Sequence, residues 1–162
     1  MLYIGENHTI SMPEKFKRGP SLVKDVMNAK VVIAKPEATA KEAAKVMAEA
    51  HIGALVVLSG TNIAGIVTES DLIRKIIAEG NDAAQTRLDQ MMTKNVKTIE
   101  ADRELEEAAD MMVENNIKKL PVVKGGKLVG ILTSTDLISF EPKFIESLSQ
   151  LLMLKPRESM AG

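Results

Sequence analysis

Residues 117–136 read IKKLPVVKGGKLVGILTSTD, and residues 52–71, which lie 65 positions earlier, read IGALVVLSGTNIAGIVTESD. Both stretches begin with Ile, pass through an apolar run to a Gly, and end in Gly-Ile-x-Thr-x-(Ser/Thr)-Asp. The match extends without a gap over residues 27–73 and 92–138, where 17 of the 47 aligned positions are identical. Self-similarity at a fixed offset is the signature of a repeat architecture, so the chain is a tandem duplication.

Each copy predicts the same succession of elements: a strand, a helix, two strands joined by a turn, and a second helix. The first helix has apolar residues at helical spacing, and in copy one Thr39 and Glu42 form a capping-box pattern at its start. The turns at 59–62 and 124–127 contain glycine, and Gly80 suits the end of a second helix. We expect strands at 31–33, 54–58, 63–67, 96–99, 120–123 and 128–132, with the second helices beginning near residues 70 and 135.

These β-α-β-β-α units predict a mixed α/β (α+β) fold. Nearly continuous apolar strands with helices beside them indicate a sheet with at least one covered face. One unit of about 50 residues buries too little surface alone, so the two repeats are expected to pack with pseudo-twofold symmetry. The expected domains are 21–80 and 81–140, the second including a linker at 81–90, with an N-terminal arm at 1–20 and a C-terminal helix and tail at 141–162.

The C-terminal helix is expected to start just after Pro142 and to reach about residue 155. Its apolar face would consist of four residues, Ile145, Leu148, Leu151 and Leu152. This face can pack on its own domain or contact another subunit, and the sequence leaves both possibilities open.

The composition narrows the classes of function. The chain is 45% hydrophobic and 27% charged, with a formal net charge of −1, so no long-range field favours nucleic acid or an anionic membrane. It has no Cys, and its two histidines, His8 and His51, cannot form an imidazole cluster, so no metal site is expected. Without a signal-like segment or an apolar run of about 18 residues, we expect a cytoplasmic protein that does not enter membranes.

The third strand of each copy runs into its helix through two hydroxyl residues and an aspartate: Thr68, Ser70 and Asp71, then Thr133, Thr135 and Asp136. A helix N-terminus favours an anion such as phosphate. The hydroxyls can donate to phosphate oxygens, and the carboxylate can accept from ribose hydroxyls. Thr-x-x-Asp is also an ordinary capping box, and duplication copies caps as well as sites. The pattern alone therefore leaves a ligand site and a structural cap open.

The paired pattern resembles the CBS domain family, named for cystathionine β-synthase, whose tandem pairs form a Bateman module. In copy two the resemblance rests on residues 117–123, the Gly-Gly turn and residues 130–136. In copy one it rests on residues 52–57 and 65–71. Each motif alone is weakly specific, but the combination is strong, and it covers about residues 21–140.

The resemblance implies two ligand clefts between the paired domains. In such clefts the Asp holds the ribose, nearby hydroxyls hold phosphate or ribose, and the opening strand of the opposite copy flanks the adenine. Carried over by position, one cleft takes Asp136, Thr133 and Thr135 together with Val31, Val32 and Ile33. The other takes Asp71, Thr68 and Ser70 together with Val96, Lys97 and Thr98.

The two clefts are expected to differ in their affinity for phosphate. Family members that hold phosphates often carry basic residues just before the Leu-Pro-Val-Val strand, and here these are Lys118 and Lys119. Their counterparts in copy one are the uncharged Gly53 and Ala54. A charged hydrogen bond contributes about 1.5–3 kcal/mol. We therefore expect the Asp136 cleft to be the better phosphate site, although two solvated lysines at a strand start are the alternative.

The resemblance implies a regulatory sensor of AMP, ADP or ATP with no other cofactor. Two alternatives stay open: a sensor of S-adenosylmethionine or methylthioadenosine, and a protein-interaction module without a ligand. An enzyme is the least supported interpretation, because no nucleophile, base or metal cluster stands out. Pairs in this family commonly dimerise through their helices, so a homodimer is expected, with a protein target that the sequence does not identify.

Overall fold

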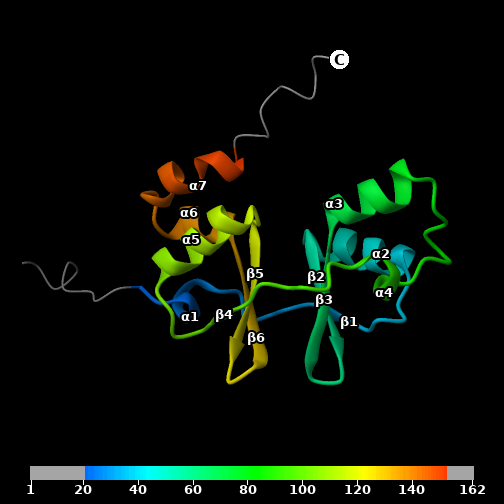
Figure 1. Ribbon diagram of the computed structural model, residues 1–162, viewed down its shortest axis with the longest axis horizontal. Coiled ribbons are helices and arrows are strands. Elements are labelled where there is room, and N and C mark those ends of the chain that lie inside the picture. Colours follow the sequence, from blue (N-terminus) through cyan, green and yellow to red (C-terminus); the bar gives the residue numbers. More distant parts are fainter. Residues whose placement is uncertain (1–20, 153–162) are drawn as a thin grey trace, which may run out of the picture.

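The computed structural model describes residues 21–152 of the 162-residue chain. It consists of two similar lobes, each a three-stranded sheet with helices packed beside it (Figure 1). The mixed α+β architecture and the β-α-β-β-α order of each repeat are as predicted. The expected N-terminal arm and the last residues of the expected C-terminal helix lie outside the described residues.

The first lobe contains β1 (Ile33–Ala34), α2 (Ala40–Ala50), β2 (Ala54–Ser59), β3 (Asn62–Thr68), α3 (Glu69–Asp71) and its π-helical continuation η2 (Leu72–Ala78). The second lobe contains β4 (Ile99–Glu100), α5 (Leu105–Asn115), β5 (Lys119–Lys124), β6 (Lys127–Thr133), α6 (Ser134–Phe140) and α7 (Phe144–Leu152). Two short helices that the sequence analysis did not predict, α1 (Val23–Val26) and α4 (Leu88–Met91), precede the two repeats. In each sheet a parallel strand, β1 or β4, is followed by an antiparallel hairpin.

Local sequence signals account for where these elements begin and turn. The predicted capping box at α2 is present, because Thr39 Oγ1 accepts from the Glu42 amide at 3.2 Å while Glu42 Oε2 accepts from the Thr39 amide at 2.7 Å. The hairpin between β5 and β6 places Gly125 at φ 57° and Gly126 at φ 79°, a conformation that side chains with a Cβ disfavour. These two glycines therefore permit the tight turn between β5 and β6.

The short helices are exchanged between the repeats. Val23 of α1 is fully buried in the core of the second lobe, and its amide donates to the Arg103 carbonyl at 2.8 Å. Leu88 of α4 is equally buried in the first lobe, and its amide donates to the Ala38 carbonyl at 2.8 Å. Figure 1 shows α1 with the second repeat and α4 with the first. Each lobe is thus completed by the segment that precedes the other repeat.

This exchange corrects the predicted extent of the opening strands. The segment before β1 bridges to β6 at Asn28–Ile131, and the segment before β4 bridges to β3 at Thr93–Ile66. The chain must then cross from one sheet to the other before it can pair again. Only the last predicted residues, Ile33 and Ile99, enter a ladder, so the strands expected at 31–33 and 96–99 are shorter and begin later.

The crossing segments are residues 27–32 and 92–98, which connect the two sheets ahead of β1 and β4. Two glycines permit these segments to lie on the sheets. A Cβ on Gly130 would lie 2.5 Å from Met27 Sδ, and a Cβ on Gly65 would lie 2.4 Å from Met92 Sδ. Real Cβ atoms do not approach sulfur so closely. The identical Met and Gly pairs of the duplication therefore mark one packing contact that occurs in both lobes.

The C-terminal helix α7 packs on its own domain, which is one of the two arrangements that the sequence left open. Phe144, Leu148 and Leu151 are buried in the second lobe's core, and α7 contacts α5 and α6. Ile145 was predicted to belong to this face, but it is 52% exposed. No helix within the described residues is long and apolar enough to cross a membrane.

Candidate functional site

The two aspartates of the repeated motif occupy equivalent positions, three residues past the strand end, and both are part of a cap. Asp71 Oδ2 accepts from the Thr68 amide at 2.9 Å, and Asp136 Oδ2 accepts from the Thr133 amide at 2.9 Å. In return, each Thr Oγ1 accepts from the Asp amide, at 3.3 Å and 3.1 Å respectively. The capping interpretation of this motif is therefore confirmed in both lobes.

Capping occupies only one carboxylate oxygen, and the second oxygen distinguishes the lobes. Asp71 is buried, and its Oδ1 forms an ion pair with Lys75 Nζ at 3.2 Å. Asp136 is half-buried, and no hydrogen bond or ion pair reaches its Oδ1 from residues 21–152. Asp136 therefore keeps an acceptor that a ligand hydroxyl can use.

The predicted hydroxyl residues divide into two kinds. Thr68 and Thr133 are half-buried and serve the caps, whereas Ser70 and Thr135 are exposed beside the carboxylates. Ser134, which the sequence analysis did not single out, is only 3% exposed, and its amide donates to the Lys118 carbonyl at 2.9 Å. This backbone hydrogen bond ties the end of β6 to the residue that precedes β5.

The crossing segments lie at the junction of the lobes, as an arrangement with contributions from opposite copies requires. Four of the predicted residues in these segments, Val31, Val32, Val96 and Thr98, are half-buried. Lys97 is exposed. The structure brings the start of the first segment onto β6, which ends at the Asp136 motif, and the start of the second onto β3. Direct ligand contacts from these residues stay predictions.

Ile33 also borders a different hollow from the one expected. It is 54% exposed and lines a groove of about 650 Å³ between β1 and α2, on the first lobe. Ala34 and Val46 form part of its wall, and the equivalent positions of the second repeat carry the bulkier Ile99 and Met111. The lining residues include neither aspartate.

The two predicted lysines differ in environment. Lys118 is exposed, whereas Lys119 is half-buried. Burial lowers the pKa of Lys119, Glu69 opposes this by raising it, and Lys118 lowers it further. A Cβ on Gly53 would lie 3.2 Å from Glu69 Oε2 and 3.7 Å from Lys119 Cε. The small residue at position 53 therefore leaves room where an acidic chain of one repeat meets a basic chain of the other.

Sequence reasoning missed Lys75 and Glu69, although a signal was available for the first. Lys75 follows Asp71 by four residues, which is the spacing of an ion pair along a helix. Glu69 approaches Lys119 only through the contact between the two repeats, and no local pattern indicates it. Within residues 21–152, no group of three His, Asp or Glu side chains could hold a metal ion.

The sequence profile of the CBS domain matches this chain twice, at residues 23–78 and 88–143. An uncharacterised 17.7 kDa protein of Acidianus ambivalens is 38% identical over 117 residues, which are 71% of this chain and 70% of the relative.

Two solved structures share both repeats. A CBS domain pair in complex with 5′-methylthioadenosine and S-adenosyl-L-methionine superposes with a TM-score of 0.70 at 29% identity, covering 77% of this chain and 98% of that one. A hexameric CBS-CP12 protein from bloom-forming cyanobacteria gives a TM-score of 0.71 at 29% identity, covering 79% of this chain and 75% of that one.

Proposed function

Because this chain belongs to the CBS domain family, we propose that it is a regulatory protein that senses an adenine nucleotide, AMP, ADP or ATP, in the cleft of Asp136. The observation that carries this proposal is the unpaired Oδ1 of Asp136 beside the exposed Thr135 hydroxyl. A carboxylate of this kind can accept from both hydroxyls of a ribose. The protein regulates through differential binding of the ligand to two states, not through catalysis.

A nucleotide is favoured over an uncharged adenosine derivative because of the two lysines. Lys119 is partly desolvated, and a desolvated ammonium gains more from a phosphate than a solvated one does. The domain pair that binds methylthioadenosine and S-adenosylmethionine supports the adenosine class as a whole. Those two ligands are the alternative occupants, and an interaction module without a ligand is the second alternative.

Ligand-dependent melting tests the adenosine class. We expect AMP, ADP or ATP to raise the melting temperature of the full chain, since a ligand at a hundred times its Kd stabilises by about 2.7 kcal/mol. Asp136→Asn keeps an oxygen for the cap but removes the charge, so it should abolish the shift. The control is Asp110→Asn, on the exposed face of α5. Unchanged melting with every member of a panel of the three nucleotides, methylthioadenosine and S-adenosylmethionine would refute the proposal.

A lysine variant separates the ligand classes. Lys119→Met should weaken nucleotide binding about 10- to 150-fold, which corresponds to one charged hydrogen bond. It should leave methylthioadenosine affinity within about twofold. Lys127→Met, at the exposed start of β6, is the matched control. Equal losses for both ligands would show that Lys119 supports the cleft without contacting phosphate.

We also propose a homodimer through the helical face of the first lobe. In the second lobe α7 covers α5, so Ala109 is 2% exposed and Ile138 half-buried. At the equivalent positions of the first lobe Ala44 is exposed and Ile73 is 59% exposed, next to Ile77 at 74%. In the second lobe α7 covers this apolar face. In the first lobe the equivalent face would be covered by a second copy of the chain.

Sedimentation velocity tests this assembly. Ile77→Glu should convert the dimer to a monomer, because a desolvated carboxylate without a partner opposes burial. Ile145→Glu, on the outer side of α7, introduces the same charge at a similarly exposed isoleucine and should leave the dimer intact. A monomeric wild-type chain at micromolar concentration would exclude the proposed dimer.

A further inference from the structure

The two equivalent aspartates, Asp71 and Asp136, differ in the residue that follows four positions later, one helical turn further along. Position 75 is Lys and its counterpart, position 140, is Phe. Lys75 Nζ lies 3.2 Å from Asp71 Oδ1, while Asp71 Oδ2 accepts from the Thr68 amide at 2.9 Å and from Thr68 Oγ1 at 3.1 Å. Both oxygens of Asp71 are therefore engaged within the protein.

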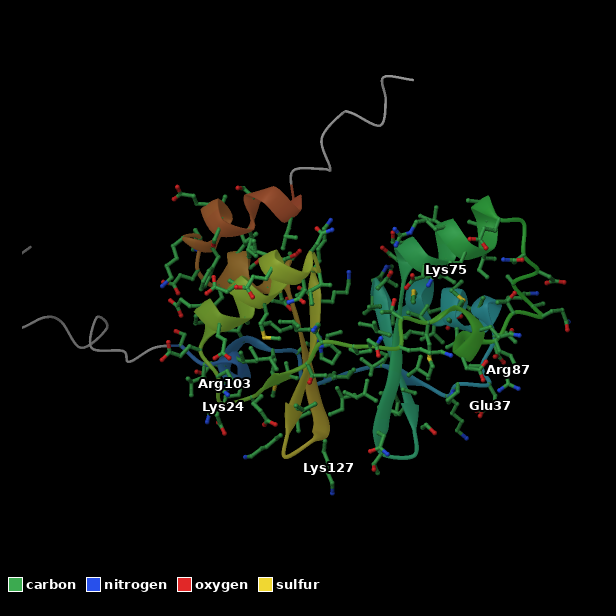
Figure 2. The ribbon with its side chains drawn as sticks, viewed as in Figure 1. Lys24, Glu37, Lys75, Arg87, Arg103 and Lys127 are labelled. Atoms are coloured by element: carbon green, nitrogen blue, oxygen red, sulfur yellow. The ribbon has the colours of Figure 1, made fainter. Side chains whose placement is uncertain are left out.

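Lys75 is held from two sides. Its ammonium also donates to the Met91 carbonyl at the end of α4, so it joins η2 to the helix that precedes the second crossing segment. The Asp71 side chain is 6% exposed and that of Lys75 is 36% exposed. Figure 2 places Lys75 among the helices of the first lobe. Phe140 is 43% exposed and offers no donor to Asp136.

We propose that Lys75 is an internal occupant of the Asp71 carboxylate, which closes the first cleft to ribose ligands and limits the chain to one ligand, bound at Asp136. This inference rests on the proposed function, because it assumes that ribose is recognised by these aspartates. A ribose at Asp71 has to displace an ion pair whose carboxylate side chain is only 6% exposed. Because the Lys75 side chain is 36% exposed and solvent screens the pair, this competition should weaken binding roughly 5- to 10-fold relative to an unpaired carboxylate.

We call this occupation of the Asp71 carboxylate by Lys75 the lock. It makes Lys75 a residue that determines specificity between the clefts. It acts independently of Lys118 and Lys119, because those lysines can strengthen phosphate binding but leave the ribose acceptor unchanged. Removing Lys75 should therefore open the first cleft to methylthioadenosine as well as to AMP. If Lys75 instead bound ligand phosphate itself, its removal would weaken AMP binding and leave methylthioadenosine unaffected.

Binding stoichiometry tests the proposal. Equilibrium dialysis with radiolabelled AMP and methylthioadenosine should give one ligand per wild-type chain and two per Lys75→Met chain. The double variant Lys75→Met/Asp71→Asn should return to one. Lys45→Met removes a lysine that pairs with Glu49 on the exposed side of α2, and it should stay at one. Two ligands on the wild-type chain, or a folded Lys75→Met chain that binds no more ligand than the wild-type chain, would overturn the lock.

The outcomes separate this inference from the proposed function. If the wild-type chain binds nothing and Lys75→Met gains one site that Asp71→Asn removes, the Asp136 site is wrong and the lock stands. If the wild-type chain binds one ligand that Asp136→Asn abolishes and Lys75→Met gains none, the Asp136 site stands and the lock is wrong. If Lys75→Met does not fold, carboxyl ¹³C signals of the wild-type chain decide: saturating AMP should shift the Asp136 signal and leave the Asp71 signal in place, and equal shifts would overturn the lock.

Discussion

Truncation of Leu148 measures how strongly α7 is docked on the second repeat. Leu148 is fully buried in a core that also contains Leu105, Met112 and Leu137. Leu→Ala changes in cores cost about 2–5 kcal/mol, through lost transfer free energy plus the cavity left behind. Since α7 lies at the edge of the lobe and can settle into part of that cavity, we expect about 2–3 kcal/mol for Leu148→Ala.

Urea denaturation followed by circular dichroism gives this free energy directly. At about 2–4 °C per kcal/mol for a chain of this size, the melting temperature should fall by about 4–12 °C. Ile145→Ala, one turn away on the same helix but 52% exposed, should cost no more than about 0.5 kcal/mol. Equal costs for the two variants would show that α7 is not held on the lobe by this face.

Three further predictions follow from named contacts. Thr39→Ala removes the cap of α2 and should lower the free energy of unfolding by about 0.5–2 kcal/mol in urea titrations, whereas Thr39→Ser should cost less. Gly130→Ala places a Cβ 2.5 Å from Met27 Sδ and should cost about 1–3 kcal/mol, and a double-mutant cycle with Met27→Ala should show a smaller penalty in the truncated background. The hydrogen bond from Lys143 lowers the pKa of Glu106, so Lys143→Met should return that pKa, followed by NMR, toward about 4.3. Because the folded-state pKa is lowered, the stability lost in this variant should be constant above that ordinary value and should disappear as the pH falls through the lowered one.

The local elements could be predicted because their signals are local. The apolar spacing of α2, the cap at Thr39 and the Gly125-Gly126 turn each fix a neighbouring backbone conformation, and each is found where the sequence places it. The aspartates at the strand ends were found for the same reason, since the duplication repeats them at one offset.

The exchange of α1 and α4 could not be predicted, because its energy lies in contacts between residues far apart in the chain. Val23 is buried against a core whose other members begin at Ile99, and no periodicity within a four-residue helix reveals that partner. The late start of β1 has the same origin. Val31 and Val32 look like strand residues because they are apolar, but they lie half-buried in the segment that crosses between the sheets and do not pair with β2. The meeting of Lys119 with Glu69 likewise depends on the packing of one repeat on the other.

The differences between the repeats are as informative as the identities. Gly65/Gly130, Thr68/Thr133 and Asp71/Asp136 are identical, and they build the crossing contact and the cap in both lobes. The pairs that differ include Gly53/Lys118, Ala54/Lys119, Glu69/Ser134 and Lys75/Phe140, which lie around the carboxylates or between the repeats. In each of these pairs one repeat has a charged residue and the other an uncharged one, while the backbone fold is the same. The two repeats therefore share one scaffold, but Asp71 is paired with a lysine and Asp136 is not. An exchange of the residues at positions 75 and 140 should therefore move the open ribose acceptor from Asp136 to Asp71 while both caps stay intact.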